Sequence, residues 1–137
     1  MTKVAIITGA GSGVGRETAK KLSEDGSLVI LIGRREEKLK ETRDHCSNDT
    51  WVMPMDVSNI SQVTNCFEKI EKECSRLDLL FNNAGVFIPG KTADQVSYDE
   101  WKYVIDTNIN GMFLFSKFAF SLMKKQNPQG GRIINNG

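Results

Sequence analysis

The chain has 137 residues, about the length of one ordinary domain, and its 39% of hydrophobic and 26% of charged residues are typical of a globular rather than a disordered protein. Lys and Arg number 18 against 17 Asp and Glu, and this balance lacks the concentrated positive charge of a dedicated nucleic-acid-binding protein. No apolar run reaches the roughly 18 residues of a membrane-spanning helix, so we expect neither nucleic acid nor a membrane as a partner.

The N-terminal part of the chain has the pattern of two strands joined by a helix. Residues 3–8 and 28–32 are apolar runs without alternating polarity, as expected for strands buried on both faces of a parallel sheet. The first run is too short for the hydrophobic region of a signal peptide. Between the runs we expect a helix over residues 13–25, which Gly26 ends. One face of this helix carries Val14, Thr18 and Leu22.

A charged helix and a third strand come next. Residues 35–46 are predicted to form an exposed helix. We interpret three of its charged residues as a solvated face rather than as a binding patch: Glu37, Lys38 and Glu41. Residues 51–55 predict a strand, and Pro54 near its end favours an edge position, because proline donates no hydrogen bond to a neighbouring strand.

The helix that follows the third strand carries an apolar stripe. Ser58 or Ser61 is expected to cap its N-terminus. The stripe consists of residues at helical spacing, Val63, Cys66, Phe67, Ile70 and Cys74. Because the three cysteines are odd in number and include no C-x-x-C pair, we expect Cys66 and Cys74 to be buried, reduced thiols of a cytoplasmic protein. The chain has a single histidine, and no metal site is expected.

Two more strands and a long helix complete the chain. Residues 77–81 predict the fourth strand and residues 132–135 the fifth. Between them, Ser97 is expected to begin a helix that extends to about Lys125. Residues 112–123 are apolar on almost every side, which predicts that this helix buries one face on its own sheet and another on a partner subunit. Alternating strands and helices with short connections indicate an α/β fold with a doubly wound parallel sheet.

A glycine-rich segment lies where the first strand gives way to the first helix. Residues 8–15 read Thr-Gly-Ala-Gly-Ser-Gly-Val-Gly. At such a turn, backbone N–H groups and the positive end of the helix can approach a pyrophosphate without a side chain in the way. No Gly-Lys-Ser/Thr follows, so this is not a Walker loop. The alternative is a flexible turn without a ligand, but the position at the start of a series of strand–helix units favours a dinucleotide site.

Four sequence blocks occur together and in a fixed order: the glycine segment, Asp56-Val57, Asn-Asn-Ala-Gly at residues 82–85, and Asp-Thr-Asn-Ile-Asn-Gly at residues 106–111. By these blocks the chain resembles the short-chain dehydrogenase/reductase family. The order of strands and helices is similar to that family over residues 3–137. The resemblance implies that residues 1–137 form an NAD(P)-binding domain of Rossmann type, truncated after its fifth strand. It also implies an oxidoreductase that reduces carbonyl compounds or oxidises secondary alcohols.

The same resemblance implies which residues bind the cofactor. Asp56 would bind the adenine amino group, with Val57 beside it; the alternative for Asp56 is a helix cap. The turn formed by Asn83, Ala84 and Gly85 would pass under the ribose, and a purely architectural role is the alternative, although the two roles overlap. The dinucleotide loop would consist of Gly9, Ser12, Gly13, Val14 and Gly15.

The end of the second strand favours NADP over NAD. Folds of this kind that bind NAD place an acid about 20 residues beyond the glycine loop, where it binds the ribose 2′-hydroxyl. Here Gly33 occupies that place and Arg34 follows. A guanidinium is suited to a 2′-phosphate, which an acid would repel. The alternative is that Arg34 and Arg35 only begin the charged helix.

For catalysis, the resemblance implies an asparagine in the long helix that holds a water relay. Asn108 matches it, and a solvent-facing or helix-kinking role is the alternative. The resemblance also implies a serine and a tyrosine–lysine pair after the fifth strand. Neither the serine nor the pair lies beyond that strand within these 137 residues. Tyr98 and Lys102 form a literal Y-x-x-x-K, but they precede Asn108, and we interpret them as part of a helix N-terminus.

Two hypotheses follow from the sequence. In the first, the chain is the N-terminal part of an NADP(H)-dependent enzyme that acts on a small-molecule carbonyl or alcohol. This enzyme would form a homo-oligomer through residues 98–125. In the second, the chain is a catalytically incompetent form that binds only nucleotide or a partner subunit.

Overall fold

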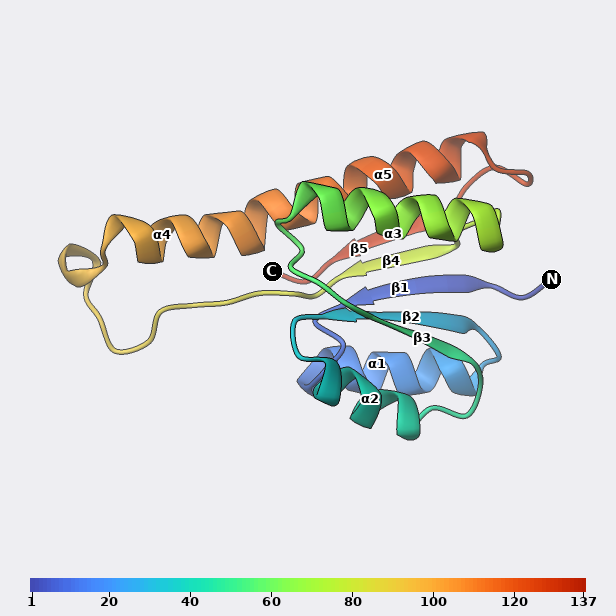
Figure 1. Ribbon diagram of the computed structural model, residues 1–137, viewed down its shortest axis with the longest axis horizontal. Coiled ribbons are helices and arrows are strands. Elements are labelled where there is room, and N and C mark those ends of the chain that lie inside the picture. Colours follow the sequence, from blue (N-terminus) through green and yellow to red (C-terminus); the bar gives the residue numbers. More distant parts are fainter.

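A five-stranded parallel sheet forms the centre of the structure, a computed structural model that describes residues 1–137 (Figure 1). The strand order is β3-β2-β1-β4-β5, which confirms the predicted doubly wound sheet and the edge position of the strand that contains Pro54. Ile6 of β1 pairs with Ile30 and Leu80 on its two neighbours. The strands are β1 (Val4–Thr8), β2 (Leu28–Gly33), β3 (Thr50–Pro54), β4 (Leu79–Asn82) and β5 (Arg132–Asn135).

Helices cover both faces of the sheet (Figure 1). On one face lie α1 (Gly13–Glu24) and α2 (Glu36–Asp44), and on the other lie α3 (Ile60–Glu73) and α5 (Met112–Lys125). A short 3₁₀ turn, η1 (Ala93–Gln95), leads into α4 (Tyr98–Ile105), which extends beyond the sheet. None of these helices is both long and apolar enough to cross a membrane.

The sheet separates two hydrophobic cores. The core under α3 and α5 is the larger, and it includes the ring of Phe115, which meets Phe67 edge to face at 5.6 Å between centroids. The core under α1 and α2 contains Ala19, Leu39 and the β2 residue Leu31. Burial on both faces explains why β1 and β2 are apolar throughout rather than alternating.

The buried face of α1 differs from the predicted one. The residues of α1 that are buried are Gly15, Ala19 and Ser23. Of the predicted face, Val14 is 60% exposed. Thr18 and Leu22 are half-buried, and Leu22 packs against the core under α1 and α2. Small side chains allow a helix to approach a sheet closely, so small residues occupy the fully buried positions of α1 and the larger Leu22 lies at the margin of the contact.

The N-terminus of α3 is capped by neither of the predicted serines. Asn59 is the cap, and its side-chain oxygen accepts a hydrogen bond from the Gln62 N–H at 3.0 Å. The Ser58 hydroxyl instead donates to Asp56 at 2.8 Å. The predicted stripe is buried except at Cys74, which is half-buried. Burial raises the pKa of the Cys66 thiol to about 12, and none of the three cysteines forms a disulfide.

The predicted long helix is present, but it has a π-helical segment in the middle. Ser97 caps α4 and forms a capping box with Glu100, as in the helix N-terminus predicted from the sequence. The helix continues through η2 (Asp106–Gly111), a π-helix, into α5. Such a segment aims its side chains differently from a regular helix and is frequent at functional sites.

The fourth strand begins at Leu79, two residues later than predicted, and the side chain of Asp78, just before it, contacts the start of β1. One carboxylate oxygen of Asp78 accepts a hydrogen bond from the Val4 N–H at 2.8 Å. The other lies 2.6 Å from the Arg76 guanidinium. Partial burial opposes ionisation, but Arg76 and the Val4 amide outweigh it and hold the pKa of the Asp78 carboxyl below its usual value.

A lowered pKa in the folded state has a defined consequence for stability. The ionised carboxylate stabilises the fold above the unfolded-state pKa, and this contribution is lost as the pH falls through the folded-state pKa. We expect Asp78→Asn to lower the free energy of unfolding by about 1–3 kcal/mol at pH 7. The difference from wild type should shrink below about pH 4.

Urea unfolding of wild type and Asp78→Asn between pH 7 and pH 2 measures this effect. Asp25→Asn is a suitable control, since Asp25 is exposed and its carboxylate takes part in no side-chain hydrogen bond or ion pair. A destabilisation by Asp78→Asn that is equal at both ends of the pH range would contradict the role assigned to the charge.

Candidate functional site

The candidate site lies at the carboxyl edge of the sheet, where the strand order reverses between β1 and β4. At such a switch point the loops that follow neighbouring strands diverge and leave a crevice. An open pocket of about 160 Å³ occupies this place. Its lining comes from the segments at the ends of β1, β2, β3 and β4, from the first turn of α2 and from η2. The lining residues are Gly9, Gly11 and Ser12; Gly33, Arg34, Arg35, Lys38 and Leu39; Met55 and Val57; Ala84, Gly85 and Val86; and Thr107.

The glycine loop is packed too closely to accept side chains. Gly9 has φ +63°, and a Cβ there would lie 3.0 Å from the Ala84 Cα. A Cβ on Gly15 would lie 2.2 Å from the Gly9 carbonyl oxygen and 2.7 Å from the side chain of Asn83. The loop therefore depends on glycine for a left-handed turn at one position and for a close backbone approach at the other.

The start of α1 offers an anion site. Ser12 has an extended backbone and accepts no capping hydrogen bond with its side chain, and the first turn contains no acidic residue. The first N–H groups of a helix have no partner within the helix, and they lie at its positive end. A pyrophosphate fits this arrangement, because no acid repels it and no cap competes with it for these N–H groups.

The turn after β4 is fastened to the glycine loop by Thr8, the last residue of β1. The Thr8 hydroxyl accepts hydrogen bonds from the N–H groups of Asn83 at 2.8 Å and Ala84 at 2.9 Å. The Asn83 side chain donates to the Gly9 carbonyl at 3.3 Å. Sequence reasoning did not select Thr8; the signal for it is a hydroxyl at the end of an otherwise apolar strand, where burial requires partners.

Basic side chains border the pocket where β2 and β3 end. Arg34, Arg35 and Lys38 belong to the lining, and no acidic residue does. Arg34 pairs with Asp56 across 3.4 Å. Partial burial opposes ionisation of Asp56, but hydrogen bonds from Ser58 and the charge of Arg34 outweigh it and hold the pKa of this carboxyl below its usual value.

The assignment of Lys38 to a purely solvated face is wrong. The charged helix begins at Glu36, so Lys38 lies in its first turn, and a Cβ on Gly11 would lie 3.0 Å from the Lys38 Cβ. The stem of Lys38 therefore packs on the glycine loop, while its ammonium group pairs with Glu41 at 3.3 Å. Helical spacing alone does not reveal this, because the contact depends on how α2 crosses the loop.

Asn108 lies in the π-helical segment and faces the loop after β4. Its side-chain oxygen accepts a hydrogen bond from the Val86 N–H, and its amide nitrogen donates to the Val86 carbonyl, both at 2.8 Å. Asn108 is half-buried. It lines a smaller cavity next to the main pocket, together with Thr8, Ala84 and Thr107. The structure thus gives this amide two backbone partners and places it near the pocket but not in its lining.

The predicted site residues divide into two groups. Those in the pocket lining are Gly9, Ser12, Arg34, Val57, Ala84 and Gly85. Those outside it are Gly13, Val14, Gly15, Asp56, Asn83 and Asn108. Three of the second group, Gly15, Asp56 and Asn83, contact lining residues as described above, whereas the Val14 side chain is exposed to solvent. Sequence reasoning did not select Lys38 or Thr107 for the site.

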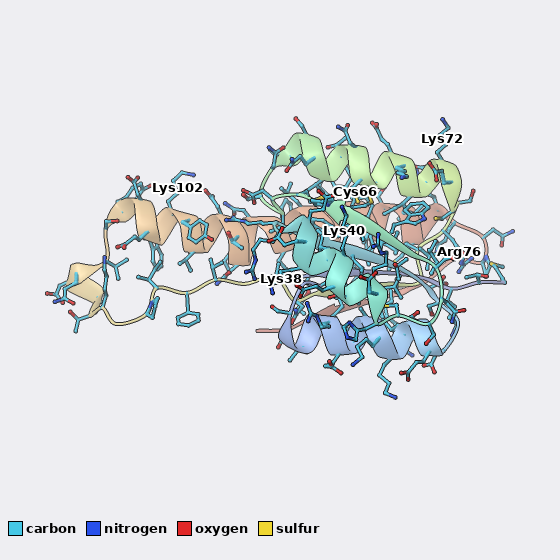
Figure 2. The ribbon with its side chains drawn as sticks, turned by 60° about the horizontal axis from the view of Figure 1, so that its bottom comes forward. Lys38, Lys40, Cys66, Lys72, Arg76 and Lys102 are labelled. Atoms are coloured by element: carbon cyan, nitrogen blue, oxygen red, sulfur yellow. The ribbon has the colours of Figure 1, made fainter.

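The Tyr98–Lys102 pair lies outside the pocket lining. Tyr98 is 76% exposed, and Lys102 forms an ion pair with Asp106 at 2.5 Å. Figure 2 shows Lys102 on the projecting α4, well away from Lys38 on α2. This placement agrees with the interpretation of the pair as part of a helix N-terminus.

Comparison with known proteins gives one consistent family. The family model described as short chain dehydrogenase matches residues 3–137. A curated relative, the 3β-hydroxysteroid dehydrogenase of Mediterraneibacter gnavus, is 34% identical over 136 residues, which cover 97% of this chain and 48% of that protein. The chain spans about half the length of the curated relatives it matches.

Two solved structures that hold nicotinamide nucleotides have the same fold. A metagenomic short-chain oxidoreductase in complex with NADP has a TM-score of 0.89 at 29% identity, covering 97% of this chain and 60% of that one. The 3-ketoacyl-(acyl-carrier-protein) reductase from Brucella melitensis, complexed with NADH, has a TM-score of 0.91 at 27% identity, covering 97% and 55%. With a family model that matches nearly every residue and with these neighbours, the chain belongs to the short-chain dehydrogenase family.

Proposed function

We propose that this chain is the nucleotide-binding part of an NADP(H)-dependent oxidoreductase that reduces a small-molecule carbonyl compound or oxidises a secondary alcohol. The observation that carries the proposal is the pocket at the switch point of the sheet. One end of the pocket is the glycine loop at the start of α1, and the other is a basic border. No acidic residue lines this border, and Asp56 pairs with its Arg34 from outside the lining. The first end suits the pyrophosphate of a dinucleotide, and the second suits the 2′-phosphate that NADP has and NAD lacks.

Each part of the pocket has a proposed ligand group. Arg34 would bind the 2′-phosphate, and Asp56 with Val57 would receive the adenine. The turn of Asn83, Ala84 and Gly85 would support the ribose. The pyrophosphate would bind the loop of Gly9, Ser12, Gly13, Val14 and Gly15. When bound, the nicotinamide nucleotide supplies or accepts a hydride.

The choice of NADP over NAD depends on the side chains at the end of β2. The family fold by itself does not select, since one neighbour holds NADP and another holds NADH. In this chain Gly33 and Arg34 both line the pocket, and a guanidinium can form paired hydrogen bonds to a phosphate. A carboxylate at this place would instead favour the free 2′-hydroxyl of NAD.

The long helix has two further proposed roles. Asn108 would hold a water relay, and its contacts with Val86 orient its side chain for that role. The exposed rings of Phe113 and Phe120, at 62% and 63% exposure, support a homo-oligomer that packs through residues 98–125. Solitary exposed apolar side chains are ordinary, but several on one helix mark an interaction surface.

Binding of NADPH and NADH to the purified chain tests the nucleotide assignment. We expect NADPH to bind about tenfold or more tightly than NADH, because only NADPH carries the phosphate that Arg34 can bind. Equal affinity, or tighter binding of NADH, would overturn the NADP assignment.

Turnover is tested separately, by NADPH oxidation with a mixture of aldehydes and ketones. Binding without turnover by these 137 residues would favour the catalytically incompetent form. If the chain does turn over, Tyr98→Phe should leave the rate unchanged, and loss of activity in this variant would make the literal Y-x-x-x-K pair catalytic.

A further inference from the structure

The Arg34 side chain contacts Tyr103, a residue of α4 that is distant from it in sequence. One guanidinium nitrogen, Nη1, donates a hydrogen bond to the Tyr103 hydroxyl at 2.9 Å, although the two residues are 69 positions apart in sequence. The guanidinium carbon lies 4.9 Å from the centre of the Tyr103 ring. Both a hydrogen bond and a cation–π contact therefore join α4 to the end of β2.

Two more contacts complete the restraint on Arg34. Its second nitrogen, Nη2, lies 3.4 Å from the Thr107 hydroxyl and 3.4 Å from the Asp56 carboxylate. The neighbouring Arg35 also lines the pocket, but its side chain makes no hydrogen bond or ion pair. Of the two arginines at this end of the pocket, Arg34 alone is fixed in place by side chains of other elements.

We propose that Tyr103 is a positioning residue for nucleotide specificity, which holds the Arg34 guanidinium at the pocket wall ready for a 2′-phosphate. The proposal rests on the NADP assignment made above. Arg34 belongs to the pocket lining and Tyr103 does not. We therefore expect the effect of Tyr103 on a bound nucleotide to pass through Arg34.

The physical basis is the ordering of a flexible side chain. An arginine with 43% of its side chain exposed samples many rotamers when it has no partner, and a ligand that binds it must bear the cost of ordering it. When fixed neighbours already order the guanidinium, the ligand loses less binding free energy to the ordering of this side chain. Among the three partners, Tyr103 offers both a ring face and the shortest hydrogen bond, so we expect it to contribute the largest share.

A double-mutant cycle on the whole chain tests this role. Dissociation constants for NADPH and NADH are measured for wild type, Tyr103→Ala, Arg34→Ala and the double variant. We expect Tyr103→Ala to raise the constant for NADPH about three- to tenfold and to change that for NADH by no more than about twofold. In the Arg34→Ala background, Tyr103→Ala should have no further effect on NADPH binding.

Two variants serve as controls for folding and chemistry. Tyr103→Phe keeps the ring and loses the hydroxyl, so its affinity for NADPH should lie between wild type and Tyr103→Ala; it also decides the matter if the alanine variant does not fold. Tyr98→Ala removes another tyrosine from the same helix, one that has no contact with Arg34, and should bind both nucleotides as wild type does.

Each failure has its own signature. Equal weakening of NADPH and NADH by Tyr103→Ala, or an undiminished effect in the Arg34→Ala background, would show a merely structural role and overturn the proposal. A wild-type chain without preference for NADPH would overturn the proposed function and this inference with it. A preference that Arg34→Ala abolishes but both Tyr103 variants retain would overturn the inference alone.

Discussion

Replacing Arg34 by alanine is expected to weaken the binding of NADPH by about 10- to 100-fold and to leave the binding of NADH nearly unchanged. Hydrogen bonds between a guanidinium and a phosphate are charge-assisted and stronger than those between neutral groups. NADH has no phosphate at this place and loses nothing when the guanidinium is removed. The preference for NADPH should therefore disappear in this variant, as measured by titration of each nucleotide.

The design of this experiment includes a matched arginine. Arg43→Ala removes the same charge from the last turn of α2, where Arg43 pairs with Asp44 and takes no part in the pocket lining. It should bind both nucleotides as wild type does. Arg34→Lys keeps the charge but loses the paired geometry, so we expect an intermediate affinity for NADPH. Equal losses in Arg34→Ala and Arg43→Ala would mean that only the net charge matters.

Replacing Gly15 by alanine is expected to weaken the binding of both NADPH and NADH by about tenfold or more. The preference for NADPH over NADH should stay unchanged. The new Cβ would lie 2.2 Å from the Gly9 carbonyl oxygen, a backbone atom that cannot rotate away. The loop and the start of α1 must then move apart, which displaces the N–H groups proposed for the pyrophosphate. Overpacking of this kind also costs about 1–3 kcal/mol of stability.

Thermal unfolding and titration with both nucleotides measure these two effects. A suitable control is Gly26→Asn, just beyond the opposite end of α1. Gly26 has φ +88° with no atom within 4 Å of an added Cβ, and asparagine is among the residues that tolerate a left-handed backbone best. Gly26→Asn should keep nucleotide binding. Wild-type affinity in Gly15→Ala would show that the glycine loop does not hold the pyrophosphate.

The sequence predicted the strands and most helices because their signals are local. Apolar runs such as residues 28–32, and the stripe through Val63 and Phe67, report how deeply each element is buried, and burial follows from side-chain chemistry. The glycine segment was equally informative. Its backbone requirements exclude nearly all other residues, so its position in the sequence indicates its position in the fold.

Other features could not be predicted because they depend on contacts between distant segments. Val14 is larger and more apolar than Ala19, yet Ala19 is buried, because the closeness of α1 to the sheet decides the face. Ser58 was a reasonable cap for α3, but its hydroxyl binds Asp56. Lys38 has the spacing of an exposed residue and reaches the pocket only because α2 crosses the glycine loop.

In the candidate site, too, some features follow from local sequence signals and others depend on contacts between distant segments. By itself, the sequence determined that the chain has the fold of the short-chain dehydrogenase family, and it identified the glycine loop and Arg34 as candidate binding residues, because backbone freedom and charge are properties of single residues. Only the tertiary structure decided which side chains surround Arg34. Tyr103 carries no local signal of that contact, since it depends on where α4 lies relative to the end of β2, a segment 69 positions away in sequence.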